Sequence, residues 1–408
     1  MKVCLIYDGA YPWDVRVWKF SRTFVEHGHE VHLVCRLLHP GPETPPREET
    51  RDGVFIHRVA AHARPRVNDA LNFPAFFSPW WIRRINGVVR EHHIDLIVVR
   101  DLPLALTAIG VGRVAGVPVI YDMAEPYPAM LRDMWRFEPF RWHNLLVRNV
   151  GLATMVEFAA TRLADHTVVV VEEARQYLLA KGVPAAKLST ISNVPYLDEA
   201  VSPSPSDPRP AAIASLSLGY VGGVEPMRGL ERVLDMIPAV TRAIPLFQFV
   251  IVGGGKGEDG LRQRINALGL NERVVLTGRQ EYAEAQRRAG QCDVGIIPHL
   301  ITPHTTATIP NKLFEYMLLG KPVIATDLGP IARVIADAQC GFVYRNEAEF
   351  LDALTALRDP ALRRRLGENG RQAVRNTYNW NLEASRLLQT AGSVARGSHR
   401  AWSASAAL

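Results

Sequence analysis

Apolar runs and amphipathic segments alternate along the first half of the chain. The apolar runs at residues 3–7, 30–35, 53–59, 95–99, 118–121 and 167–171 predict strands. The amphipathic segments at residues 15–27, 80–92, 104–115, 141–163 and 172–181 have helical periodicity, and several end at a glycine. Strands that are apolar throughout and alternate with helices are typical of a parallel sheet covered by helices on both faces.

The same alternation begins again after a break in the pattern. The run SPSPSDPRP at residues 202–210 predicts a linker over 196–214. Strands are then expected at 216–221, 248–252, 274–276, 294–297 and 322–325, and helices at 229–239, 260–267, 283–288, 311–319 and after Glu347. We therefore expect two α/β domains of Rossmann type, residues 1–195 and 215–375, with their ligands at the carboxyl ends of the strands in a central cleft. The tail, residues 392–408, is rich in Ser, Ala and Arg and is expected to be disordered.

The composition agrees with two domains and narrows the class of protein. With 408 residues, of which 48% are hydrophobic and 22% charged, the chain can bury a core in each domain. Its four cysteines lack the spacing of metal or redox motifs, which favours a reducing compartment. No apolar run has the length of a signal peptide or of a membrane span, so a cytoplasmic location is expected. The formal net charge of +6 suits phosphate-bearing substrates or anionic lipids, and no nucleic-acid motif is present.

The strongest chemical signal is the segment IPNKLFEYMLLGKPVI at residues 309–324. It predicts a helix preceded by Pro310, followed by Gly320 and then by a buried strand. The N–H groups at the helix start, near Asn311 and Lys312, form an anion site, to which Lys312 adds a point charge. Glu315, one turn further on, either accepts hydrogen bonds from the two hydroxyls of a ribose or simply caps the helix and faces solvent.

This segment resembles the signature of the retaining GT4-type glycosyltransferases of GT-B fold, the glycosyltransferase group 1 family. Further stretches similar to that family cover almost the whole chain in the expected order: DVRV at 14–17, VRDLP at 99–103, YDMAE at 121–125, SNVP at 192–195, GGVEPMRG at 222–229, VGGG at 252–255 and YNW at 378–380. The resemblance implies a GT-B fold, in which two Rossmann-like domains have parallel sheets facing a central cleft. It also implies that a helix over 376–391 crosses back to the N-terminal domain.

The resemblance places the nucleotide sugar on the C-terminal domain and the acceptor on the N-terminal domain. It implies that Glu315 holds the ribose and that Arg228 and Lys312 act in catalysis as two cations on the leaving diphosphate. The implied donor-binding residues are Gly222, Gly223, Arg228, Gly253, Gly254, Asn311, Lys312, Leu313 and Glu315. No Asp-x-Asp motif occurs, which disfavours the metal-dependent, single-domain transferase design.

Three positions depart from the family pattern. The first of two family carboxylates falls at Ala307, a second basic residue falls at Gly223, and a histidine falls at Ala124. Recognition of the sugar must then use other groups, such as backbone N–H groups between Thr306 and Ile309. Residues 255–260 also match G-x-G-x-x-G, but the match begins too far after its strand and no acid ends the next strand, so we interpret it as a tight turn rather than an NAD site.

Six residues of the N-terminal half are further candidates. Glu125 ends a predicted strand and is the third catalytic candidate, as a contact to acceptor or donor sugar rather than as an assigned general base. The candidates for acceptor or cleft contacts are Asp8, Gly9, Asp14, Arg16 and Glu172. Structural interpretations are open beside the functional ones: Asp14 as a helix N-cap, Arg16 as a charge on the helix surface, and Glu172 as a helix cap. For Asp14 and Arg16 the two interpretations have equal weight.

Residues 71–84, LNFPAFFSPWWIRR, place aromatic side chains beside arginines. Two interpretations stay open: contact with a membrane interface, which would imply a lipid-linked acceptor, and a hydrophobic flap or core segment. The histidines at 27, 29, 32, 92 and 93 show no metal-ligand spacing. His299 and His304 flank the loop before the Glu315 helix, within reach of a donor.

Together these features predict transfer of a hexose-type sugar from a UDP- or GDP-linked donor to a hydroxyl acceptor, with retention and without a cofactor or metal. The expected context is cell-surface polysaccharide or glycoconjugate biosynthesis, in the cytoplasm or at the inner face of the cell membrane. Two alternatives stay open. One is a nucleotide-sugar epimerase of the same fold, which needs acids and a histidine converging on the sugar. The other is a catalytically degenerate nucleotide-binding partner subunit, against which the presence of Arg228, Lys312 and Glu315 argues.

Overall fold

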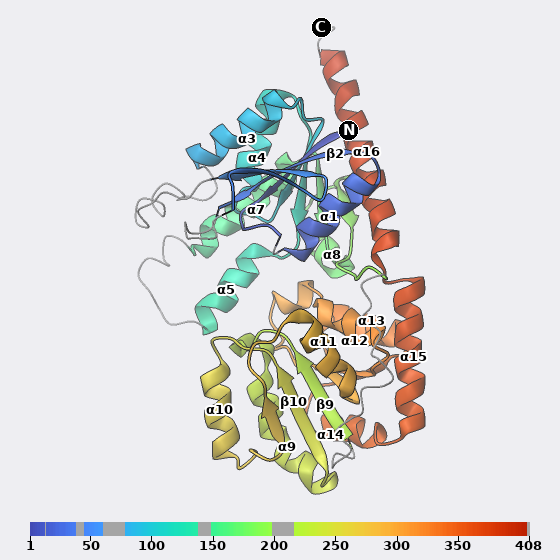
Figure 1. The fold of residues 1–408 in the computed structure, drawn as a ribbon. Coiled ribbons are helices and arrows are strands. Elements are labelled where there is room, and N and C mark those ends of the chain that lie inside the picture. Colours follow the sequence, from blue (N-terminus) through green and yellow to red (C-terminus); the bar gives the residue numbers. More distant parts are fainter. Residues whose placement is uncertain (13, 38–44, 60–77, 138–147, 198–215, 406–408) are drawn as a thin grey trace. The chain divides into compact units, whose positions relative to one another are not determined.

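The computed structural model describes residues 1–12, 14–37, 45–59, 78–137, 148–197 and 216–405 (Figure 1). The chain divides into two compact units: unit 1 contains Met1–Ser192 and Glu383–Leu408, and unit 2 contains Asn193–Leu382. Most of the predicted linker, residues 198–214, lies outside the described residues. Each unit is an α/β structure around one sheet.

Unit 1 is built on an eight-stranded sheet in the order β3-β4-β2-β1-β5-β6-β7-β8. Its strands are β1 Lys2–Tyr7, β2 Glu30–Arg36, β3 Glu48–Arg51, β4 Val54–Val59, β5 Leu96–Arg100, β6 Val119–Met123, β7 His166–Val169 and β8 Leu188–Thr190. Neighbouring strands are parallel, except that β3 is antiparallel to β4. The predicted apolar strands are confirmed. The edge strands β3 and β8 were not predicted from the sequence, because they are short and mostly polar, with the sequences EETR and LST.

The helices of unit 1 cover this sheet. They are α1 Val15–Glu26, α3 Pro79–Glu91, α4 Ala105–Ala115, α5 Tyr127–Phe137, α7 Val150–Leu163, α8 Glu172–Ala180 and the short 3-10 helix Ala185–Lys187. α5 was not predicted. The predicted helix over 141–163 is present from Val150, and its first residues, 141–147, lie outside the described part.

The prediction that the tail from residue 392 is disordered is wrong for residues 392–405. Residues 392–405 belong to α16, which spans Trp380–Ser405 and is labelled in Figure 1. The apolar side chains of Leu387, Ala391 and Ala395 recur every fourth residue and are buried. This spacing places them on one face of the helix, so a sequence rich in serine and arginine still has an apolar stripe to pack.

Unit 2 contains a six-stranded, all-parallel sheet in the order β11-β10-β9-β12-β13-β14. Its strands are β9 Leu216–Val221, β10 Phe247–Val252, β11 Val274–Leu276, β12 Val294–Ile297, β13 Val323–Thr326 and β14 Gly341–Tyr344. Its helices are α9 Leu230–Ala243, α10 Glu258–Ala267, α11 Tyr282–Gln291, α12 Asn311–Leu318, α13 Gly329–Ala338, α14 Glu347–Ala356 and α15 Pro360–Asn376, with 3-10 turns η3 Pro226–Arg228 and η4 Thr305–Ala307. The predicted strands are all present, and α13 and β14 add one further unit of the same alternation.

Within the described ranges, no helix combines the length and the apolar character that a membrane crossing requires.

Candidate functional site

Two glycine turns meet where β9 and β10 end in unit 2, which Figure 1 shows side by side. The N–H of Gly222 donates to the carbonyl of Val252 over 2.9 Å, and the N–H of Val224 donates to the carbonyl of Gly254 over 3.1 Å. Gly253 has a φ of +147°, and a side chain there would overlap the carbonyl oxygen of Gly222. The turns therefore need glycine in order to approach each other, and they form the floor of the predicted donor site.

Lys312, the second residue of α12, extends over this floor. Its Nζ lies 3.8 Å from the centroid of the Tyr220 ring, a cation–π contact. A Cβ at Gly222, whose φ is +136°, would come within 2.8 Å of the same Nζ. No side chain caps the N-terminus of α12, so the N–H groups of its first turn add a partial positive charge beside the lysine.

Arg228 brings a second cation to the same place. Its Nη1 lies 3.3 Å from Nε2 of His299, and its Nε has no hydrogen-bond partner among the described residues. Burial lowers the pKa of His299 well below its usual value, and the charges of Lys312 and Arg228 lower it further. The imidazole is therefore neutral and can accept a hydrogen bond from the guanidinium of Arg228.

The surroundings of Lys312 disfavour its charge. Burial lowers the pKa of Lys312 well below its usual value, and Arg228 lowers it further, against the raising effect of Glu315. A doubly charged anion between Lys312 and Arg228 would relieve both the burial cost and the repulsion. The arrangement is therefore suited to bind a phosphate or diphosphate group.

Glu315 lies one turn along α12 from the cations. One oxygen of its carboxylate, Oε2, accepts a hydrogen bond from Nε2 of Gln286 in α11 over 3.0 Å. Gln286 was not singled out from the sequence, because no motif relates α11 to α12. The contact gives the Glu315 carboxylate a fixed orientation, as a residue that holds a ribose would need.

Two sequence expectations for this region need correction. Leu313 is fully buried in the core, and its N–H donates to the carbonyl of Pro310 over 3.1 Å, so it offers little to a donor. The N–H groups of Thr306 and Ala307 donate within their own loop, to the carbonyls of Thr302 and His304. Of the backbone groups expected to bind the sugar, these two are therefore already engaged, because the loop closes into the 3-10 turn η4.

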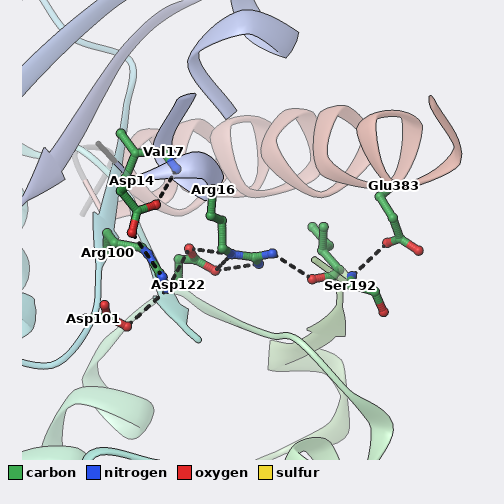
Figure 2. Close-up of polar contacts among 9 residues, drawn as sticks. Asp14, Arg16, Val17, Arg100, Asp101, Asp122, Ser192 and Glu383 are labelled. Atoms are coloured by element: carbon green, nitrogen blue, oxygen red, sulfur yellow. Dashed lines mark hydrogen bonds and ion pairs between the residues drawn. The ribbon is translucent and has the colours of Figure 1, made fainter. Parts of the chain in front are cut away.

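In unit 1, a network of ion pairs lies at the carboxyl ends of β5 and β6 (Figure 2). Arg16 is 1% exposed and binds Asp122 with two nitrogens: its Nε lies 2.9 Å from Oδ2 and its Nη2 lies 2.7 Å from Oδ1. Its Nη1 donates to the carbonyl of Ile191 over 3.0 Å. Arg16 is therefore an interior residue, and not the helix-surface charge or the acceptor contact that the sequence suggested.

Asp14 joins this network from the start of α1. Its Oδ1 accepts from the N–H of Val17 over 2.8 Å, which confirms the N-cap interpretation. Its Oδ2 lies 3.5 Å from Arg100, and Arg100 lies 3.1 Å from Asp101 and 3.7 Å from Asp122. Arg100, Asp101 and Asp122 were not singled out from the sequence as site residues, although each lies just after a predicted strand in a family-like stretch.

Asp101 has two unusual properties. It has a φ of +62°, which is uncommon for a residue other than glycine and is found preferentially at functional sites. Burial raises the pKa of Asp101 to about 7, and the carboxylates of Glu125, Asp122 and Asp14 add to the rise, against the lowering effect of Arg100. An acid that titrates near neutral pH at the carboxyl edge of a parallel sheet is a candidate for proton transfer or substrate binding.

Replacing Asp101 by asparagine is expected to stabilise the protein at about pH 8 and to have little effect at about pH 4. The folded pKa lies above the unfolded value, so the folded state favours the protonated acid, and its stability falls as the pH rises through 7. Asparagine imitates the protonated acid at every pH. Urea unfolding of both proteins at the two pH values measures the difference.

Asp52→Asn is the matched control for this change. Asp52 also has a positive φ, of +51°, but its side chain is 74% exposed. The control measures how much stability asparagine adds in a left-handed conformation for reasons unrelated to the pKa, so that this amount can be subtracted. An equal gain at both pH values, or an equal gain in the control, would contradict the assignment of a raised pKa to Asp101.

The remaining candidates of unit 1 have structural partners. Asp8 forms an ion pair with Arg36 at the end of β2, and the carbonyl of Gly9 accepts from the N–H of Arg36 over 2.8 Å. Glu172 accepts hydrogen bonds from Arg175, Gln176 and Thr190. All three donors are side-chain groups, and the start of α8 has no side-chain cap, so these contacts do not make Glu172 the helix cap that the sequence suggested. Glu125 is half-buried beside Asp101 and Arg100, and its role stays a prediction.

A second cluster was missed from the sequence. His32 of β2, His57 of β4 and His92 at the C-cap of α3 bring one ring nitrogen each within 4.8 Å of one another. Burial lowers the pKa of His57 to about 4, and His92 lowers it further, against the effect of Glu91. The spacing of these histidines in the sequence did not indicate that they meet. Pairing of β2 with β4 and the packing of α3 bring them together.

Both halves of the chain match known family models. Residues 215–373 match the model described as glycosyl transferases group 1, and residues 14–194 match the model described as glycosyl transferase 4-like domain. A phosphatidyl-myo-inositol mannosyltransferase of Mycobacterium leprae is 32% identical over 42% of this chain and 44% of the relative. An alpha-D-kanosaminyltransferase of Streptomyces kanamyceticus is 29% identical over 37% of this chain and 38% of the relative, so the chain spans less than half the length of these two relatives.

A longer match and two solved structures extend the comparison. A D-inositol 3-phosphate glycosyltransferase of Nocardia farcinica is 25% identical over 92% of this chain and 83% of the relative. Sucrose-phosphate synthase from Thermosynechococcus elongatus has a TM-score of 0.77 at 18% identity, over 96% of this chain and 98% of that one. An Anabaena protein solved in complex with UDP-glucose has a TM-score of 0.70 at 16% identity, over 96% of this chain and all of that one. At these identities the two structures show the shared GT-B fold.

Proposed function

Since the chain belongs to the group 1 glycosyltransferases of GT4 type, we propose that it transfers a sugar from a nucleoside diphosphate sugar to a hydroxyl group of an acceptor. The observation that carries this proposal is the convergence of Lys312, Arg228 and His299 on one place at the N-terminus of α12. Burial and mutual repulsion disfavour the charges of these cations, and a diphosphate would offset both effects.

The cations also account for catalysis. When the bond between the anomeric carbon and the phosphate oxygen breaks, negative charge develops on that oxygen. Lys312 and Arg228 stabilise this charge more in the transition state than in the ground state, which lowers the barrier. Because two protein cations are already in place, we propose that the reaction needs no metal ion on the diphosphate.

We propose that the transfer retains configuration, as the family resemblance implies. The acceptor oxygen then forms its bond to the anomeric carbon on the face from which the phosphate departs. The acceptor proton passes to the oxygen of the leaving phosphate, so no protein base is required. His299 is neutral and bonded to Arg228, and its part is to hold that guanidinium in position.

The nucleoside is assigned to the other end of the same site. Glu315, oriented by Gln286, accepts hydrogen bonds from the ribose hydroxyls. The glycine turns at 222–223 and 253–254 leave room for the nucleotide, and Asn311 lies at the helix N-terminus beside Lys312. A uridine diphosphate sugar is the first donor to test, because a protein of this fold was solved with UDP-glucose.

Unit 1 is proposed to bind the acceptor, with Glu125 and Asp101 as the carboxylates that meet its hydroxyls. A lipid-linked acceptor at the inner face of a membrane is the class we favour, within glycoconjugate biosynthesis. At the start of α3, Trp80 is 52% exposed and Ile82 is 40% exposed, beside the exposed Arg83, whereas Trp81 is buried. The described part of the segment 71–84 thus supports both sequence interpretations, and residues 71–77 lie outside it.

Thermal unfolding with nucleoside diphosphates tests the donor site, using UDP, GDP, ADP and dTDP without added metal. A ligand at about a hundred times its dissociation constant is expected to stabilise the protein by about 2.7 kcal/mol. Glu315→Ala should lose this stabilisation, because the ribose contact is gone. Glu368→Ala, which removes an exposed carboxylate of α15, is the matched control and should keep it.

A failure of all four nucleotides to stabilise the wild-type protein would sink the donor assignment. If the nucleotide stabilised Glu315→Ala as much as the wild type, the ribose would not be bound by Glu315. With the base known, products formed from the matching sugar nucleotide separate the alternatives. A transferase releases nucleoside diphosphate, an epimerase returns an isomeric sugar nucleotide, and a partner subunit without activity does neither.

A further inference from the structure

Three histidines of unit 1 meet where β2, β4 and the end of α3 come together. His32 is 1% exposed and His57 is 7% exposed, and His92 is half-buried. Nδ1 of His32 lies 2.9 Å from Nε2 of His57. The His92 ring stacks on His32 at a centroid distance of 4.2 Å and lies 5.3 Å from the His57 ring. One ring nitrogen of each histidine lies within 4.8 Å of the corresponding nitrogens of the other two.

The outer nitrogens of the two buried rings face carboxylates. Nε2 of His32 lies 2.9 Å from Glu30, and Nδ1 of His57 lies 2.6 Å from Glu48 on the antiparallel edge strand β3. Glu48 also contacts Arg84, and Nη2 of Arg84 lies 3.4 Å from the same nitrogen of His57. A ring nitrogen that faces a carboxylate carries the proton of a neutral imidazole.

This placement of protons leaves a conflict at the centre of the cluster. A neutral imidazole has one N–H, so if both outer nitrogens are protonated, both inner nitrogens present a lone pair. These two lone pairs face each other across 2.9 Å. With both outer nitrogens protonated, this repulsion is relieved by a positive centre, which is either an additional proton or a metal ion.

We propose that His32, His57 and His92 form a structural metal site for a zinc-like transition-metal ion. Imidazole nitrogens are ordinary zinc ligands, and a carboxylate on the outer nitrogen is the arrangement that fixes the tautomer of a ligating histidine. Two nitrogens on one tetrahedral zinc ion lie about 3.3 Å apart, so the pair needs to separate only slightly. The carboxylates of Glu30 and Glu48 balance the charge of the ion, and water can reach the half-buried His92 side as the fourth ligand.

The site would hold α3 against the sheet edge, away from the proposed chemistry. His32 is the third residue of β2, whereas Arg36, four residues on, is at the strand end where Asp8 and the carboxyl edge lie. Four residues of strand span about 13 Å. The ion would therefore belong to unit 1 alone, and the reaction proposed for the diphosphate site does not use it.

Metal binding to the purified, chelator-treated protein tests the proposal, with Zn²⁺ and Co²⁺ themselves as probes. The wild type is expected to bind one equivalent of Zn²⁺ and to unfold at a higher temperature with it. Co²⁺ in the same site should give the visible absorption of a four-coordinate complex, and Zn²⁺ should displace it. Glu30→Gln should weaken binding by about 10–100-fold, because it removes the carboxylate that orients His32.

Two variants separate the site from unspecific binding. His92→Gln changes a half-buried residue at a helix end and should remove the cobalt spectrum and the thermal shift with the fold intact. His93→Asn is the matched control, because His93 is exposed, adjacent and has a positive φ that asparagine tolerates. Absence of a cobalt complex in the wild type would overturn the proposal in favour of a shared proton. Unchanged binding in His92→Gln would overturn it too.

Discussion

Lys312→Met is expected to slow sugar transfer by about 10²–10³-fold while leaving the protein at least as stable as the wild type. The rate falls because one of the two cations that stabilise the leaving diphosphate is lost. Stability does not fall, because the Lys312 ammonium is buried, faces Arg228 and has a pKa well below its usual value. Methionine keeps most of the side-chain volume over the Tyr220 ring without the charge.

The pH dependence of this variant gives a second check. A lysine whose folded pKa lies below the unfolded value destabilises the protein most at low pH, and the cost declines as the pH rises toward the usual pKa of lysine. The stability gain of Lys312→Met should therefore shrink as the pH rises. Steady-state kinetics and urea unfolding across pH measure both effects.

Arg264→Met is the control for removal of a cation from unit 2. Its side chain is 48% exposed and pairs with Asp235 on the surface. It should change neither the rate nor the stability by much. If Lys312→Met lowered the free energy of unfolding by as much as it raised the activation free energy of transfer, the lysine would be a structural residue.

Arg16→Met is expected to destabilise the protein by about 3–5 kcal/mol. The substitution leaves Asp122 buried, with Arg100 at 3.7 Å as its remaining cation among the described residues, and it removes the hydrogen bond from Arg16 to the carbonyl of Ile191. An uncompensated buried carboxylate costs far more than the intact pair contributes. Equilibrium unfolding in urea measures the loss.

Removing both charges should recover much of that loss. The double variant Arg16→Met, Asp122→Leu takes away the orphaned carboxylate, and Arg100 keeps Asp14 and Asp101 as partners. Arg22→Met on the same helix removes a partly exposed pair with Glu26 and should cost less than about 1 kcal/mol. A double variant as unstable as Arg16→Met would show that packing, and not charge, dominates at this position.

The local pattern of the sequence determined the fold class. The apolar strands and their following helices are visible because each strand is buried on both faces, so its whole run must be apolar. The glycine turns after β9 and β10 and the helix that contains Lys312 and Glu315 were likewise predicted. Their requirements concern neighbours within a few residues: room for a backbone, an uncapped helix start and one helical turn.

The tertiary structure alone decided which charges meet. Arg16 and Asp122 are 106 positions apart, and nothing near Arg16 in the sequence shows that it is buried in an ion pair. The same is true of the raised pKa of Asp101 and of the meeting of His32 with His57 and His92. Strand order and helix packing bring these groups together, and a group's burial and electrostatic surroundings depend on neighbours in space. For this reason the sequence could name candidate residues, whereas their ionisation and partners followed only from the fold.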